Sequence, residues 1–243
     1  MRLHSTTSGS GELHVGLIHG LGGAGSTWQP LIDRMLATGR YTVTTLDLRG
    51  HGESDRAPSY TLGELADDVV EALPTGLHSV VGHSLGGAVL VRAVGRLQPD
   101  RAIYLDPGFE LSLPTSGFAG RAFWAVAPLS LGVMGLLQAR RSAPQRAALD
   151  PSIRELMKHA QQQFDAKMAV GIFREVAFHP IAITPPDVPS TIVLSDESPA
   201  VLSDATAAAL EREGWDIRRI DGIHHDMQIE DPDRTFAAVA DVL

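Results

Sequence analysis

The chain has 243 residues, no cysteine and a formal net charge of −9 at pH 7. This length suits one α/β domain with an insertion or two small domains, and the missing cysteine excludes disulfides, thiolate metal sites and cysteine nucleophiles. No run of lysines or arginines offsets the negative charge, so we expect neither nucleic acid nor a membrane as a partner.

The amino-terminal residues 1–11 are polar and lack the apolar core of a secretory signal, which predicts a cytoplasmic protein. Beyond them, short β-branched runs alternate with amphipathic stretches. The runs predict strands and the stretches predict helices. In chain order we expect a strand at 13–18, a helix through 36, strands at 41–46 and 79–81, helices at 62–73 and 88–94, and a strand at 101–105.

The alternation of strands and helices stops between residues 110 and 186, where several helical runs and no strand are expected. It resumes after residue 186. The later elements are strands at 190–194 and 215–220 and helices at 202–213 and 232–243. Alternating strands and helices predict an α/β fold with a mostly parallel central sheet and helices on both faces. We therefore expect a core formed by 1–109 and 187–243 and a helical cap formed by 110–186.

The strand that begins at Ser79 stops abruptly at Gly82, and a serine follows between two glycines. Gly82-x-Ser84-x-Gly86 between a strand and a helix is the pattern of a nucleophile elbow, a strained turn that lifts the serine above the sheet edge. Glycine fits at both flanking positions because the turn brings main chain close to them. A serine that merely caps a buried helix is the simpler alternative.

The first glycine-rich loop, which starts at Gly20, has two interpretations. Gly20, Gly22 and Gly25 satisfy the dinucleotide-binding pattern, with Asp47 at the end of the next strand as the matching acid. That interpretation leaves Ser84 and the histidine pair near the carboxyl end unexplained. A hydrolase accounts for both loops, because small residues here let a second backbone amide approach the serine.

Residues 122–139 carry no charge, and the length of this run is borderline for a membrane span. Pro128, Gly132 and Gly135 interrupt it, so we expect it to pack inside the protein or to line a pocket.

At four stretches the sequence resembles the α/β-hydrolase fold superfamily. They are His19-Gly20-Leu21-Gly22-Gly23, the run Asp47-Leu48-Arg49-Gly50-His51-Gly52-Glu53-Ser54, the elbow Gly82-His83-Ser84-Leu85-Gly86-Gly87, and the ending from Gly222 to Pro232 with His224-His225 and Glu230. The resemblance implies that Ser84 is the nucleophile and His225 the general base. It also implies an oxyanion hole formed by the amides of Leu21 and Leu85. His19, His51 and His83 are expected to have structural roles around the site.

The sequence leaves the identity of the acid in the expected triad undecided. The superfamily usually has Gly-x-x-Asp after the strand that ends here at Leu194, but this chain has Ser195-Asp196-Glu197-Ser198. Asp106 at the end of the preceding strand, Asp196 or Glu197 could serve, or the acid could be missing, because spatial geometry decides such triads.

The mechanism expected from these residues is serine hydrolase chemistry on a small, largely apolar ester, thioester or lactone, with an acyl-enzyme on Ser84. C–C bond hydrolysis or a lyase step on the same residues, a non-catalytic ligand-binding protein and a dinucleotide-binding protein are the alternatives. No cofactor and no metal are expected. Apolar side chains of the cap are expected to bind substrate: Phe118, Phe123, Trp124 and Met134, with Leu129 and Leu137 beside them.

Overall fold

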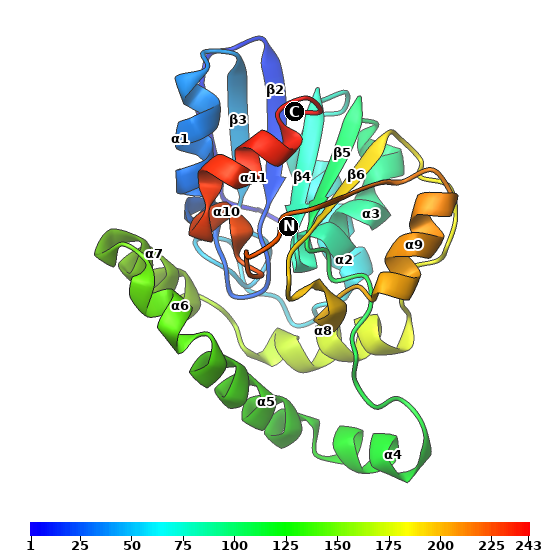
Figure 1. Cartoon of the computed structure of the whole chain (residues 1–243). Helices are drawn as coiled ribbons and strands as arrows, with labels where there is room; N and C mark the ends of the chain where they lie inside the picture. Colours follow the sequence, from blue (N-terminus) through cyan, green and yellow to red (C-terminus); the bar gives the residue numbers. More distant parts are fainter.

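A computed structural model describes all 243 residues, and a seven-stranded sheet lies at its centre (Figure 1). The strands lie in the order β1-β3-β2-β4-β5-β6-β7, and every neighbouring pair except β1 and β3 is parallel. The predicted α/β fold with a mostly parallel sheet is therefore confirmed. The strands are β1 (Ser5–Gly9), β2 (Leu13–Ile18), β3 (Tyr41–Leu46), β4 (Ser79–His83), β5 (Arg101–Leu105), β6 (Ser190–Leu194) and β7 (Asp216–Arg219).

Strand β1 was not expected from the sequence. It pairs antiparallel with β3, with Ser5 opposite Leu46 and Gly9 opposite Thr42. Its sequence Ser-Thr-Thr-Ser-Gly is polar and almost wholly exposed at the sheet edge. A strand without a buried face has no apolar alternation, so tertiary pairing alone defines it.

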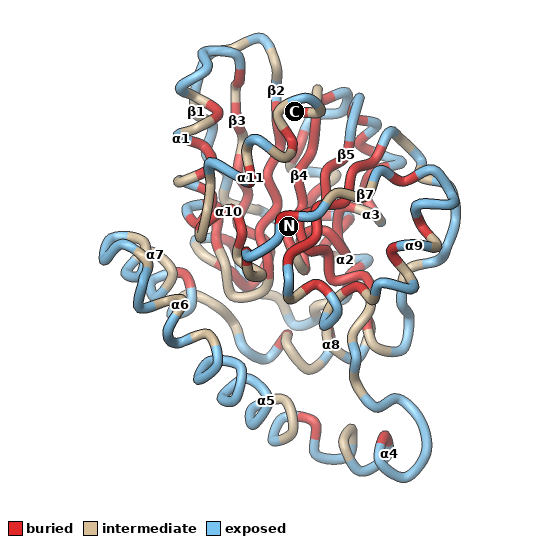
Figure 2. Tube along the Cα trace, viewed as in Figure 1, coloured by how far each residue is buried: buried red, intermediate tan, exposed pale blue.

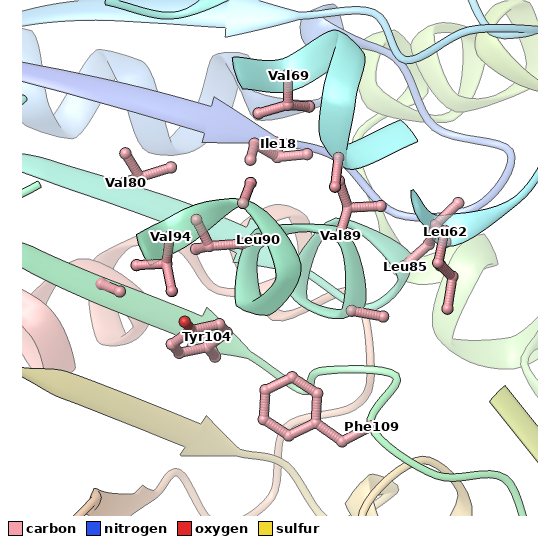
Figure 3. Close-up of a cluster of buried hydrophobic side chains, with 14 of the residues drawn as sticks. Ile18, Leu62, Val69, Val80, Leu85, Val89, Leu90, Val94, Tyr104 and Phe109 are labelled. Carbon is pink, nitrogen blue, oxygen red and sulfur yellow. The ribbon is translucent and has the colours of Figure 1, made fainter. Parts of the chain in front are cut away.

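Two groups of helices bury the two faces of the sheet. Helices α1 (Gln29–Ala37), α10 (Met227–Glu230) and α11 (Pro232–Val239) cover one face, and α2 (Leu62–Ala72), α3 (Leu85–Leu97) and α9 (Asp204–Arg212) cover the other. Figure 3 shows the second face, where Leu62 and Val69 of α2 and Val89 and Leu90 of α3 pack over the strands. This packing holds the start of α3, which follows Ser84 directly, against the strand ends.

Five helices are inserted between β5 and β6, and we call them the inserted helices. They are α4 (Gly117–Ala125), α5 (Ala127–Arg141), α6 (Ala143–Ala148), α7 (Pro151–Gln162) and α8 (Lys167–Phe178). Only α8 contributes substantially to the core, through buried Met168, Ile172 and Val176.

The prediction that the uncharged run 122–139 packs inside the protein or lines a pocket is wrong for most of its length. The run falls on α4 and α5, which lie far from the sheet in Figure 1 and are mostly exposed in Figure 2. Every residue from Gly132 to Arg141 is exposed. Apolar content in the sequence does not reveal whether such a run is buried, because that depends on its distance from the sheet.

No single helix has both the length and the hydropathy of a membrane span. Helices α4 and α5 reach that threshold only when taken together, and they are bent by 93° at the break between them.

Candidate active site

Ser84 lies in the turn between β4 and α3 with a φ angle of 51° and a ψ angle of −114°. A non-glycine residue at positive φ is strained, and such strain persists only where the surroundings enforce it. At Gly82 and Gly86 the neighbouring main chain leaves no room for a side chain. A Cβ on Gly86 would lie 2.1 Å from the carbonyl oxygen of Ile18, and one on Gly82 would lie 2.6 Å from the carbonyl oxygen of Gly86. The Gly-x-Ser-x-Gly spacing is thus a steric requirement of this turn.

The first glycine loop lies close to Ser84. A Cβ on Gly20 would be 3.1 Å from the Cβ of Ser84 and 2.9 Å from the Nδ1 of His83. Leu21 lines the same cavity as Ser84, and its amide donates no hydrogen bond within the chain. The amide of Leu85 is the first of α3, where an N–H group has no intrahelical partner. The amides of Leu21 and Leu85 therefore lie next to the serine and have no hydrogen-bond acceptor within the chain.

Two buried histidines fix the loops around this position. Nδ1–H of His19 donates to the Gly20 carbonyl over 2.8 Å, and Nε2 accepts from the Leu48 amide over 3.0 Å. His51 accepts from the Gly22 amide over 3.1 Å, while its Nδ1–H donates to the Arg49 carbonyl. Both rings act as neutral donor and acceptor, a tautomer that we assign from these partners. Burial lowers the pKa of His19 to about 4 and that of His51 to about 3, so both stay neutral near neutral pH.

His83, next to the serine, connects the elbow to the loop that carries His225. Its Nε2–H donates to the backbone carbonyl of His225 over 2.9 Å, and Gln228 donates to its Nδ1 over 3.4 Å. Burial, together with the nearby His225, lowers the pKa of His83 to about 4. A neutral ring thus fixes the main chain of the neighbouring histidine.

Asp106 and His225 meet although they are 119 residues apart. Nδ1–H of His225 donates to Oδ2 of Asp106 over 3.2 Å. Asp106 is fully buried at the end of β5, and its φ angle of 39° is again in the strained positive region. Its backbone amide bonds to the Val193 carbonyl of β6, which holds the residue in this conformation. Of the three acids that the sequence left open, Asp106 is the one whose carboxylate contacts the imidazole ring.

The loop after β6 holds the Asp106 carboxylate. The Ser195 amide donates to Oδ1 over 2.8 Å, the Ser195 hydroxyl donates to Oδ2, and the Ser198 hydroxyl donates to Oδ1. Ser195 and Ser198 stand where the superfamily usually has glycine and the acid. The sequence marked this departure from the pattern, but it did not reveal that both serines serve the acid of the neighbouring strand.

Asp196 and Glu197 lie between these serines but contact main chain instead of the ring. Oδ2 of Asp196 accepts from the Gly222 amide over 3.0 Å. Oε2 of Glu197 accepts from the His225 amide over 3.4 Å. Asp196 was one of the acids expected to bind the imidazole. It does not contact the ring, because its carboxylate accepts from the Gly222 amide instead.

The charges of this pair favour the ionised forms of both groups. Burial works against a charged His225, but the hydrogen bond and the charge of Asp106 raise its pKa above the ordinary value. Burial likewise opposes ionisation of Asp106, yet the hydrogen bonds from His225, Ser195 and Ser198 hold its pKa below the ordinary value. A buried carboxylate that accepts several hydrogen bonds stays ionised and stabilises a positive charge beside it.

Ser84 and His225 line one cavity of about 180 Å³. Its wall has 14 residues, of which Leu21, Met157 and Ile229 are hydrophobic. The inserted helices contribute Arg146, Met157 and Gln161 to it.

None of the expected cap side chains lies in the wall of this cavity. Phe118 is 81% exposed, and Met134 is exposed as well. Phe123 and Trp124 contact each other, and Trp124 contacts Phe178 of α8. The expectation that apolar cap side chains line the site is therefore wrong. The inserted helices that reach the cavity are α6 and α7, and their contribution to its wall is mainly polar. The sequence pointed to the most apolar segment, whereas distance from the strand ends decides which side chains reach the cavity.

Both carboxylate oxygens of Asp47 accept hydrogen bonds from main-chain amides of neighbouring loops. Oδ1 accepts from the Gly25 amide over 2.6 Å, and Oδ2 accepts from the Glu53 amide over 2.9 Å. In this structure the carboxylate thus holds the loops of the core, a role that the dinucleotide interpretation of the first glycine loop does not require.

The model of the alpha/beta hydrolase family matches residues 17–239. The chain belongs to this family. Curated relatives include the pimeloyl-[acyl-carrier protein] methyl ester esterases of Proteus mirabilis and Methylococcus capsulatus. The first is 37% identical over 37% of this chain and 34% of its own length, and the second is 40% identical over 41% and 37%. The chain thus matches about a third of the length of these relatives.

Solved structures of the family align along nearly the whole chain. An N-acyl homoserine lactone degrading enzyme superposes with a TM-score of 0.74 at 23% identity, covering 99% of this chain and 96% of its own. A thioesterase domain from the curacin biosynthetic pathway superposes with a TM-score of 0.68 at 19% identity, covering 98% and 93%. At these identities the superpositions establish the shared fold.

Proposed function

We propose that the protein is a serine hydrolase that cleaves a small carboxylic ester, thioester or lactone through an acyl-enzyme on Ser84. The hydrogen bond between Asp106 and His225, at the cavity that Ser84 also lines, carries this proposal. A nucleophile, a base and a group that orients the base are the three parts of such a site.

In the proposed reaction His225 accepts the proton of the Ser84 hydroxyl through Nε2 while the oxygen attacks the substrate carbonyl. The amides of Leu21 and Leu85 donate to the oxyanion that forms. His225 then passes the proton to the departing alcohol or thiol, or to the ring oxygen of a lactone, and the acyl-enzyme remains. Water attacks the acyl group with His225 as base, which releases the acid and restores Ser84.

Asp106 has two tasks in this scheme. By accepting from Nδ1–H it keeps Nε2 unprotonated and directed away from itself, as a base requires. Its negative charge then stabilises the imidazolium that forms when His225 holds the proton. Ser195 and Ser198 keep the carboxylate in this position.

The substrate class rests on the size of the cavity and on the relatives. A volume of about 180 Å³ admits a small acyl or alkoxy group. The two curated relatives described above are methyl ester esterases by name, which supports an ester as substrate. We propose that α6 and α7 act as a cap here, because Arg146, Met157 and Gln161 close one side of the cavity.

The test is hydrolysis of p-nitrophenyl acetate and butyrate, combined with labelling by a fluorophosphonate probe. The wild-type protein should turn over the short esters and be labelled at Ser84, and the variant Ser84→Ala should lose both. Turnover that persists in the variant, or a wild-type protein that the probe does not label, would reject the proposal. Labelling of Ser84 without ester turnover would redirect it to cleavage of another bond, such as a C–C bond.

A further inference from the structure

Most of the exposed large apolar side chains of the protein gather on α4, on α5 and at the residue between them, with one neighbour from α8. We call this set the apolar ridge. Their exposed fractions range from 41% to 81%. The members are Phe118, Val126, Leu129, Val133, Met134, Leu136, Leu137 and Phe178.

The ridge has the spacing of one helix face. Leu129, Val133 and Leu136 recur at intervals of four and three residues, which places them on the same side of α5. Arg140 continues this side at the end of the helix. Contiguous apolar surfaces of this kind mark sites of interaction with a partner or a membrane.

The charges around the ridge differ from those of the whole chain. Residues 111–149 contain no aspartate, glutamate or lysine, but they contain Arg121, Arg140, Arg141 and Arg146, although the chain carries a net charge of −9. In α8, Arg174 lies over the ring of Phe178, 5.9 Å from its centre. The neighbouring Glu175 points elsewhere and accepts from the Leu62 amide. The border of the ridge is therefore basic.

The helices that carry the ridge suit a position on the bilayer surface and not a transmembrane span. Helix α5 has 15 residues, a length of about 22 Å, while the hydrocarbon core of a bilayer is about 30 Å thick. The bend of 93° prevents α4 and α5 from forming one straight span. Apolar side chains beside arginines, on helices too short to cross, are typical of elements that lie in the bilayer interface.

We propose that the apolar ridge docks the protein peripherally on an anionic lipid bilayer. The apolar side chains enter the interface and the arginines contact the lipid headgroups. A second copy of the chain fits less well, since symmetric pairing of the ridge would bring its arginines against one another. The expectation of no membrane partner came from the net charge of the whole chain, an average that conceals this local basic segment.

Docking would also place the bilayer near the cavities of the protein. Gln138 and Ser142, at the end of α5, line a second cavity of about 130 Å³. This cavity shares Met157 and His225 with the one around Ser84. The proposal stands independently of the chemistry at Ser84, since binding is measured without turnover.

The experiment is co-sedimentation of the full chain with phosphatidylcholine vesicles, with and without phosphatidylglycerol, at low and high salt. We expect binding to the vesicles that contain phosphatidylglycerol and weaker binding as the salt rises. Val133→Ser with Leu136→Ser should weaken binding at least about tenfold through lost apolar burial. Arg140→Gln with Arg141→Gln should weaken it about 30-fold through lost attraction to anionic headgroups.

Matched controls change similar side chains outside the ridge. Ile183→Ser removes another exposed apolar side chain, and Arg40→Gln with Arg212→Gln removes two other exposed arginines. These variants should bind like the wild type, and all variants should keep its melting temperature because the altered side chains are exposed.

Three outcomes would overturn the proposal. They are no binding to either kind of vesicle, equal loss of binding in the controls, and a dimer in light scattering that the Val133→Ser and Leu136→Ser variant dissolves. The last outcome would assign the ridge to contact between copies of the chain.

Discussion

The loops around Asp106 and the exposed helices α4 and α5 are opposites in how they are held. Asp106 is fully buried: its amide donates to β6, and its carboxylate accepts hydrogen bonds from the loop after β6 and from His225. Along α5, by contrast, ten consecutive residues from Gly132 to Arg141 are exposed. The first region is complete within the chain, whereas the second presents surface without internal partners. A given chemical change should therefore have very different effects in the two regions.

The largest expected effect is that of Asp106→Asn on catalysis. The amide preserves the shape but removes the charge that holds the proper tautomer of His225, so kcat should fall about 10³- to 10⁴-fold. Steady-state hydrolysis of a p-nitrophenyl ester measures this change. Asp196→Asn is the matched control and should stay within a few-fold of wild type, since its carboxylate contacts only the Gly222 amide. The reverse pattern would assign the acid to Asp196.

Replacing one arginine in the buried core and one on the exposed helix α5 tests how differently the two regions contribute to stability. Arg49 binds Asp68 through two hydrogen bonds of 2.5 and 2.9 Å in a buried site. Arg49→Gln removes the guanidinium that binds the buried Asp68 carboxylate and should lower the free energy of unfolding by about 3 kcal/mol. Arg140→Gln on α5 should change it by less than about 0.5 kcal/mol. Urea unfolding measures both, and equal effects would contradict the contrast.

Ser198→Ala tests whether the loop after β6 positions the acid. The hydroxyl donates to a charged, buried carboxylate, so its loss should lower kcat/KM about tenfold. As a positioning effect the loss should fall on kcat, with KM nearly unchanged. Ser79→Ala removes another fully buried hydroxyl, one without a hydrogen-bond partner, and should leave kcat unchanged. A change in KM alone would assign Ser198 to substrate binding.

The smallest effect concerns pH. In the proposed mechanism His225 acts as a base only when it is neutral, and Asp106 raises its pKa despite the opposing effect of burial. The kcat/KM of the wild type should therefore fall as the pH drops through a value above 6.5, the ordinary pKa of histidine. Glu197 also raises this pKa, so Glu197→Gln should move the acidic limb of the profile slightly lower. A limb below 6.5 in the wild type would contradict the arrangement.

Contiguous sequence was enough for the parts of the site that depend on local backbone geometry. The turn at Ser84 requires glycine at two nearby positions for steric reasons, so a short motif identified it. The parallel strands were equally visible, because burial on both faces demands β-branched and apolar runs. Strand β1 lacked such a run and was missed, since only its pairing with β3 makes it a strand.

By itself, the sequence determined the class of fold, the strained serine turn and the histidine near the carboxyl end, because each is encoded in residues that are neighbours along the chain. Only the tertiary structure decided that the carboxylate of Asp106 meets the ring of His225, and that Ser195 and Ser198 hold this carboxylate from a distant loop. It alone also decided which inserted helices reach the cavity and which stay exposed. The physical reason is the same in each case: such contacts depend on where separate segments converge in space, and neither spacing nor apolar content records that convergence.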